Sequence, residues 1–182
     1  MVGEVCCGPD RPGQRTLADF QFPRGVYPLG RLDMDSEGLL LLSDEPGLNH
    51  RLLDPAAGHE RTYWVQVEGV PGPDAVARLA GGGLEIRGHR SLPCRVHLLD
   101  PAPDLPPRDP PIRYRAAIPT SWLEMVLVEG KNRQVRRMTA TVGFPTLRLF
   151  RAAIRSVRWD GLDQGCWRML DKEELQNLRQ RA

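Results

Sequence analysis

The chain has 182 residues, of which 41% are hydrophobic and 26% are charged, and its formal net charge is +2. This length suits one domain with a sizeable core, and no apolar run approaches the roughly 20 residues of a membrane-spanning helix. The four cysteines, which include the adjacent pair Cys6 and Cys7, show no metal-binding spacing. We therefore expect reduced thiols and a cytoplasmic protein that is not associated with a membrane.

The segment Gly30–Ser43, GRLDMDSEGLLLLS, places charged residues directly before four consecutive leucines. This pattern predicts a polar loop that leads into a short buried strand over Leu39–Leu42. A carboxylate at the entrance of a buried strand is held rigidly and is partly desolvated, and these conditions favour a nucleophile or a base. Asp33 is therefore the first catalytic candidate.

Two other interpretations of the same segment are open. The spacing matches positions 1, 3, 5, 6 and 12 of a calcium-binding loop at Asp33, Asp35, Glu37, Gly38 and Asp44. A calcium loop needs a helix on both sides, whereas Pro28 precedes this one and leucines occupy its second half. The second interpretation is a structural turn, in which the aspartates cap backbone amides and pair with Arg31.

Short elements with clear boundaries precede and follow this segment. Thr16 is expected to cap a helical turn, and Asp54-Pro55 is expected to end a short helix. Tyr63 shares one strand face with two valines and should point inward, where its hydroxyl needs a partner. The predicted elements up to this part of the chain are a turn over 16–20, a helix over 48–53, a strand around 63–67, a helix over 73–80 and strands over 84–87 and 94–98.

The second half begins with a loop rich in proline over 101–111, because proline cannot lie inside a sheet. Asn132 is expected to cap a helix over 133–142, which Gly143 ends. The other predicted elements are strands over 122–129, 146–150, 154–157 and 166–170, and a polar helix from 171 to the end. This mixture predicts an α+β domain with a bent mixed or antiparallel sheet, flanked by helices and loops.

Charge is unevenly distributed along the chain. Between residues 131 and 158 there are eight Lys or Arg and no Asp or Glu, whereas residues 33–60 hold seven acids and only Arg51 as a base. A phosphate backbone would be attracted to the basic stretch. The alternative is a solvated basic face without a partner.

Three blocks in order resemble the RNA pseudouridine synthases, in the RsuA/RluE-like branch that modifies ribosomal RNA. They are GRLDMDSEGLLLLS at Gly30–Ser43, ERTYWVQVEG at Glu60–Gly69 and VEGKNRQVRRMTATVGFPTLRLFR at Val128–Arg151. The segment Pro110–Met125 further resembles the RluE-type subgroup, which acts on the large ribosomal subunit. The resemblance extends from about Thr16 to Arg151.

The resemblance implies an enzyme that isomerises one specific uridine of ribosomal RNA, in the large subunit (23S), to pseudouridine on a flipped-out nucleotide. It implies that Asp33 is the nucleophile, that Tyr63 lies under the flipped base and that Arg136 pairs with the nucleophile. Leu149 is expected to form an apolar wall of the base pocket. No cofactor and no metal are expected. An ordinary core tyrosine is the simpler interpretation of Tyr63.

The expected partner is ribosomal RNA, bound through its phosphates. Arg31 either braces Asp35 or contacts RNA, and Arg133 replaces a histidine of many relatives. The predicted RNA-binding residues are Arg31, Lys131, Arg133, Arg137, Arg148, Arg151, Arg155 and Arg158.

We expect one catalytic domain over 1–182, acting as a monomer, without a separate amino-terminal RNA-binding domain. Related enzymes begin with a strand that carries a Lys-Pro pair, and residues 1–15 show no equivalent. The first strand is therefore uncertain, and a truncated first strand is one interpretation. Two alternatives remain, namely specificity for small-subunit RNA and a non-catalytic RNA-binding or ribosome-assembly protein on the same fold.

Overall fold

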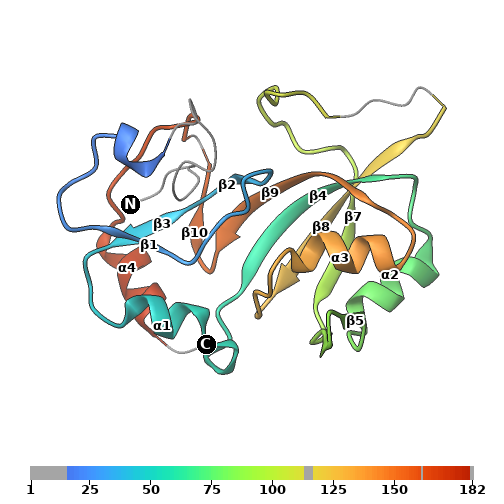
Figure 1. Cartoon of the computed structure of the whole chain (residues 1–182), viewed down its shortest axis with the longest axis horizontal. Helices are drawn as coiled ribbons and strands as arrows, with labels where there is room; N and C mark the ends of the chain where they lie inside the picture. Colours follow the sequence, from blue (N-terminus) through green and yellow to red (C-terminus); the bar gives the residue numbers. More distant parts are fainter. Residues whose placement is uncertain (1–15, 113–116, 161, 181–182) are drawn as a thin grey trace.

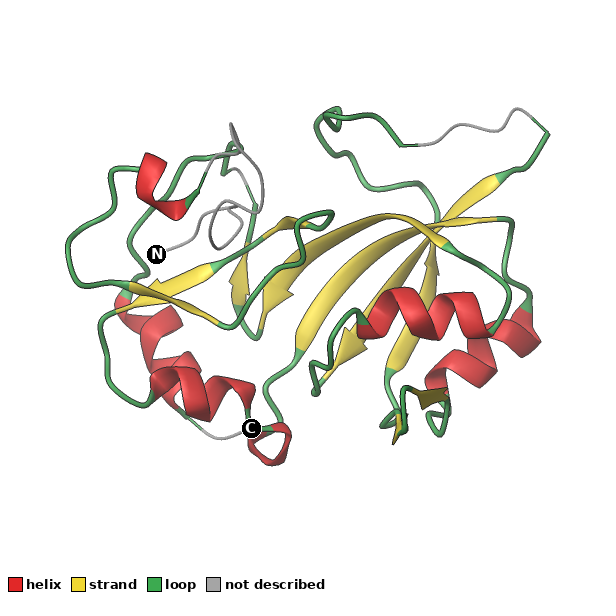
Figure 2. Ribbon diagram, in the orientation of Figure 1, coloured by secondary structure: helices red, strands yellow, loops and turns green. Residues whose placement is uncertain are grey.

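A computed structural model of the chain describes residues 16–112, 117–160 and 162–180, and the uncertain first strand in residues 1–15 lies outside them. Figures 1 and 2 show several helices around one long, curved sheet. The helices are α1 (Leu48–Leu53), α2 (Pro73–Ala80), α3 (Gln134–Thr141) and α4 (Lys172–Arg179), with 3-10 turns at Leu17–Asp19 and Pro55–Ala57. The strands are β1 (Tyr27–Leu29), β2 (Glu37–Gly38), β3 (Leu41–Ser43), β4 (Arg61–Glu68), β5 (Glu85–Ile86), β6 (His89–Arg90), β7 (Arg95–Leu99), β8 (Thr120–Leu127), β9 (Thr146–Ile154) and β10 (Val157–Arg158).

The main sheet of the described residues has the order β10-β9-β4-β8-β7, with β2 beside β9. All its pairs are antiparallel except β2 with β9, which is parallel. The sheet is therefore mixed, as predicted. The pairing of β4 with β9 shifts register between Thr62 and Tyr63 and again between Gln66 and Val67. Such irregularities bend a strand and re-aim its side chains.

The helices α2 and α3 cover one face of this sheet (Figure 2). Val65 and Val67 of β4 are fully buried there, and Tyr63 packs against the same core from a partly buried position. From α3, Val135 and Met138 enter this core. Burying each such side chain stabilises the fold by about 1.5–3 kcal/mol. Because all three residues pack in or against this core, the predicted inward face of Tyr63, Val65 and Val67 is confirmed.

The leucine run does not form the single strand that the sequence predicts. β2 ends at Gly38, the Leu39 amide donates to the Arg151 carbonyl at 2.8 Å, and β3 begins only at Leu41. Leu39 and Leu41 pack with residues of α1 and α4, whereas Leu40 and Leu42 enter a separate cluster. Gly38 has a φ of 99°, and a Cβ there would collide with the Arg151 backbone, so only glycine permits this close approach.

Three further expectations for the second half need correction. The predicted strands over 146–150 and 154–157 are one strand, β9, followed by β10, and 166–170 is not a strand. The N-cap of α3 is Arg133 rather than Asn132, and Arg133 has a φ of 52°. The Asn132 side chain is engaged instead by Arg137. The proline-rich segment is a loop, and none of the described helices is long and apolar enough to cross a membrane.

Candidate active site

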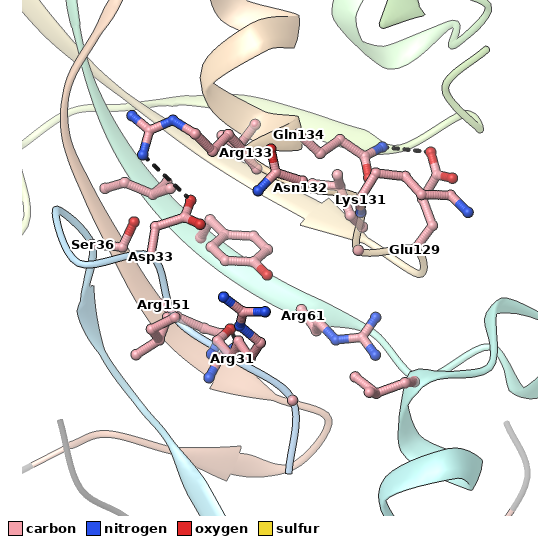
Figure 3. A pocket seen from close by; sticks show the side chains of 18 of the residues that line it. Arg31, Asp33, Ser36, Arg61, Glu129, Lys131, Asn132, Arg133, Gln134 and Arg151 are labelled. Atoms are coloured by element: carbon pink, nitrogen blue, oxygen red, sulfur yellow. Dashed lines mark hydrogen bonds and ion pairs between the residues drawn. The ribbon is translucent and has the colours of Figure 1, made fainter. Parts of the chain in front are cut away.

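A cavity of about 310 Å³ opens between the sheet, the start of α3 and the loop before β2. We call residues 30–37 the acidic loop, because they hold Asp33, Asp35 and Glu37. Side chains from the acidic loop, from β4 and β9, and from the turn that leads into α3 surround the cavity (Figure 3). These segments are far apart in the sequence, so the sheet is what brings them together.

Three residues that the sequence selected for chemistry lie around this cavity. Asp33, Tyr63 and Leu149 all line it. The Asp33 side chain is 30% exposed, and Arg133 Nη1 lies 3.9 Å from its Oδ2 (Figure 3). The cavity therefore offers a partly shielded carboxylate, a phenol ring and an apolar wall within one space.

An arginine that binds a carboxylate through two hydrogen bonds is present at this site, but it is Arg133 bound to Asp35, not Arg136 bound to Asp33. Arg133 donates two hydrogen bonds to Asp35, at 2.8 and 2.7 Å. Arg136 Nη2 donates to the Asp35 backbone carbonyl at 2.6 Å, and its Nε lies 3.4 Å from Asp35 Oδ2. Among the described residues the ion pair of Arg136 is with Asp35, so the expected direct contact with Asp33 is not seen there. Both arginines instead hold the acidic loop.

These contacts shift the pKa of Asp35 and of Arg136. Hydrogen bonds from Arg133 hold the pKa of the Asp35 carboxyl below its ordinary value, although partial burial opposes this. Burial lowers the pKa of the Arg136 guanidinium, and Asp35 partly offsets it. The Arg31 side chain is exposed, and the Asp35 carboxylate is engaged by Arg133 and Arg136 instead.

Arg148 is not available to an RNA phosphate, which corrects another expectation. It is only 8% exposed, and it donates two hydrogen bonds of 2.8 Å to Glu37 and one of 2.9 Å to the Pro106 carbonyl. Glu37 in turn lies 3.6 Å from Arg108. Because arginines occupy both Asp35 and Glu37, the calcium-loop interpretation does not fit this geometry.

Arg151 is also buried, at 4% exposure, and is not the surface contact that the sequence predicts. Its Nε donates to the Leu39 carbonyl at 2.7 Å and its Nη1 to the Arg31 carbonyl at 3.4 Å, which are the two ends of the segment that carries Asp33. Burial lowers the pKa of Arg151, while the nearby Tyr63 favours its charged form. Arg151 lines the cavity together with Tyr63.

The sequence analysis missed two charged residues of the cavity. Arg61 lines it and is buried, with hydrogen bonds to the Val128 carbonyl (3.1 Å) and the Leu52 carbonyl (2.5 Å). The alternation of β4 contained a signal for it, since Arg61 lies on the same strand face as Tyr63. A charged residue on an inward face is unusual enough to be selected as a candidate.

The second missed residue is Glu129, which is buried beside the turn into α3. It accepts hydrogen bonds from the Leu92 amide (2.7 Å), from Gln134 (2.5 Å) and from His89 (2.8 Å). Burial opposes its ionisation, but these hydrogen bonds outweigh that effect and hold its pKa below the ordinary value. Gln134 also accepts from the Lys131 amide at 2.9 Å. This network fixes the turn that carries Lys131 and Arg133.

The remaining cations lie outside the cavity or at its rim. Lys131 is exposed and lines the cavity, and Arg137 is half-buried on α3, where it bonds to Asn132. Arg155 bonds to His59 at 3.1 Å, and Arg158 pairs with Asp160 at 2.7 Å. The basic stretch is thus divided between this rim and the β9–β10 end of the sheet. Among the described residues, no group of three or more His, Cys, Asp or Glu is placed to hold a metal ion.

Comparison with known proteins agrees with this geometry. The sequence profile of the family described as RNA pseudouridylate synthase matches residues 10–141. The chain belongs to this family. A pseudouridylate synthase of known crystal structure superimposes with a TM-score of 0.77 at 26% identity, covering 97% of this chain and 72% of that one. The predicted α+β pseudouridine synthase fold is therefore confirmed.

Several curated pseudouridine synthases are similar in sequence. "Ribosomal large subunit pseudouridine synthase E" of Xanthomonas axonopodis pv. citri (strain 306) is 53% identical over 152 residues, which is 84% of this chain and 80% of that protein. The protein of the same name from Xanthomonas campestris pv. campestris is 50% identical, over 92% of this chain and 89% of that protein. "Ribosomal large subunit pseudouridine synthase B" of Bacillus subtilis (strain 168) is 30% identical, over 97% and 68% respectively.

Proposed function

We propose that this pseudouridine synthase converts one uridine of large-subunit ribosomal RNA into pseudouridine, with Asp33 as the nucleophile on a flipped-out nucleotide. The observation that carries the proposal is the cavity in which Asp33, Tyr63 and Leu149 meet. The names of the two Xanthomonas relatives support the large-subunit substrate.

The reaction breaks the bond between C1′ of the ribose and N1 of the base and forms a bond between C1′ and C5. C5 loses a proton and N1 gains one, so the isomerisation needs no oxidant and no energy input. Asp33 either adds to C1′ or removes a proton from C2′ to give a glycal. In both cases the base is detached and must stay in place until it has turned, which an enclosed cavity achieves by restricting its motion.

The surrounding residues take supporting roles. Arg133 lies 3.9 Å from Asp33 and helps to hold its side chain beside the cavity. In this proposal Tyr63 contacts the base and Leu149 forms the apolar side of its pocket, because both residues line the cavity. Arg136 acts through the Asp35 backbone, which it holds at 2.6 Å, and so keeps the acidic loop in position.

The exposed cations at the rim are proposed to bind the RNA backbone. Arg31 and Lys131 are exposed there, and Arg137 is half-buried nearby on α3. A phosphate contact from each would release condensed counterions and make affinity depend on salt. We propose that the enzyme acts as a monomer, and that it acts in the cytoplasm, on ribosomal RNA.

The proposal is tested by mapping pseudouridine in ribosomal RNA from cells with the gene, without it, and with Asp33→Asn in its place. We expect one large-subunit position to lose pseudouridine in the deletion strain and to regain it only with the unmodified gene. If pseudouridine is lost from a position in small-subunit RNA, the substrate is small-subunit RNA. If no position loses pseudouridine, the enzymatic function is contradicted. Substantial turnover by purified Asp33→Asn would refute the role of Asp33.

A further inference from the structure

Two buried arginines of the cavity lack an acidic partner. Arg61 and Arg151 are 5% and 4% exposed, and no salt bridge within the described residues joins either of them to a carboxylate. Each donates to two backbone carbonyls, and Arg151 also interacts with the Tyr63 side chain, whereas the buried Nη2 of Arg151 has no hydrogen-bond partner among the described residues. An N–H group that is buried and unpaired at the edge of a cavity is available to a ligand.

Keeping these charges buried is costly. Removing a guanidinium from water costs several kcal/mol unless an anion or a full set of hydrogen bonds compensates it. Burial lowers the pKa of Arg151, and Arg61 lowers it further because the two cations repel each other. Of the charged residues that line the cavity, five are Lys or Arg and two are Asp or Glu. Glu129 is already occupied by three hydrogen bonds. The cavity is therefore arranged to receive negative charge.

The position of the two arginines indicates which anion they meet. Figure 3 shows Arg61 and Arg151 across the cavity from the Arg133–Asp33 pair. The phosphates stay on the RNA backbone, and the exposed Lys131 at the rim is available to them. The interior of the cavity is then available to the flipped-out base. When the bond from C1′ to N1 breaks, the electron pair stays with uracil, and the resulting negative charge is spread over N1 and the two carbonyl oxygens.

We propose that Arg151, assisted by Arg61, stabilises the anionic uracil between its release from C1′ and the formation of the new bond to C5. The inference rests on the proposed function. Arg151 donates N–H groups to the base and so lowers the energy of the bond-breaking step. The negative charge is removed when the electron pair on uracil forms the new bond from C5 to C1′. C5 then releases a proton and N1 takes one up, so no further reactant is needed. The hydrogen bonds of Arg151 to Leu39 and Arg31 hold its guanidinium next to the segment that carries Asp33.

The experiment compares two RNA substrates, one with uridine at the target position and one with 6-azauridine. The 6-aza base keeps a hydrogen at C5 but is more acidic, so it needs less help to leave. We expect Arg151→Gln to slow base release in single turnovers about 100-fold on uridine, and about tenfold or less on 6-azauridine. The matched control is Arg179→Gln, an exposed arginine paired with Glu45, which should change neither rate.

Two other outcomes would overturn the inference. Equal losses on both substrates would mean that Arg151 only ties the acidic loop to β9. Alternatively, Arg151→Gln could leave the rate of base release unchanged but weaken RNA binding and reduce its salt dependence by a slope of about one. This outcome would mean that Arg151 contacts a phosphate. Normal pseudouridine formation by the unmodified enzyme in either case would leave the proposed function intact.

A second measurement needs no substitution, in case Arg151→Gln does not fold. The free base 6-azauracil ionises in the neutral range, whereas uracil does not. Inhibition of the unmodified enzyme by 6-azauracil should strengthen as the pH rises through this ionisation, and inhibition by uracil should not. If the ionised base inhibits no better than the neutral base, the cavity does not stabilise an anionic base and the inference is wrong.

Discussion

Replacing Asp35 by asparagine tests how the acidic loop is held in place. The substitution keeps the shape of the side chain and removes its charge. Asp35 accepts two hydrogen bonds from Arg133 and lies 3.4 Å from Arg136 Nε. Hydrogen bonds to charged groups contribute about 1.5–3 kcal/mol each when they are shielded. Asp35 and Arg133 are about 40% exposed, so screening reduces the net effect, and we expect the free energy of unfolding to fall by about 1–2 kcal/mol.

The same change should slow the reaction without abolishing it. Asp35 holds Arg133 at the position from which it approaches Asp33 at 3.9 Å. Releasing Arg133 leaves the nucleophile in place but less well oriented, so we expect about a tenfold lower single-turnover rate. The control is Glu45→Gln, which also removes an acid bonded to two arginines, Arg51 and Arg179. Glu45 does not line the cavity, so this control should leave the rate unchanged.

The effect on stability should depend on pH in one direction. Hydrogen bonds from Arg133 hold the pKa of folded Asp35 below its ordinary value. The stabilisation is therefore fully present above the unfolded pKa of about 4 and is lost as the pH falls through the folded pKa. Urea unfolding of the unmodified protein and Asp35→Asn across this range measures it. A pH-independent difference, or a loss of turnover as complete as in Asp33→Asn, would refute this account of Asp35.

Further predictions concern the other charged residues and the thiols. Arg148→Gln leaves the partly buried Glu37 without its two 2.8 Å hydrogen bonds, so urea unfolding should show a loss of about 3 kcal/mol, and RNA affinity measured on the folded protein should be unchanged. Lys131→Gln and Arg137→Gln should each reduce the salt dependence of RNA binding by a slope of about one; an unchanged slope for both would place the phosphates elsewhere. Burial, with a contribution from Glu129, raises the pKa of the Cys94 thiol to about 11, so mass spectrometry should find it alkylated more slowly than the exposed Cys166.

Local patterns were sufficient to predict several elements. The helix over 48–53 and the helix over 73–80 have the predicted bounds, because Asp54-Pro55 and the glycines after Ala80 end them. Thr16 caps its turn through its side chain, as expected. The alternation of β4 correctly placed Tyr63 toward the core. In each case the signal lies within a few residues of the feature that it determines.

The tertiary structure alone decided which charges meet. Arg133 bonds to an acid 98 positions earlier, and Arg148 to one 111 positions earlier. A basic residue in a basic stretch gives the same signal in the sequence whether it faces solvent, as Lys131 does, or is buried, as Arg151 is. The division of the leucine run between two cores also depends on the approach of Gly38 to β9. Side-chain pairing across a sheet is set by strand order and register, which arise from the whole packed core and are not encoded by any local spacing.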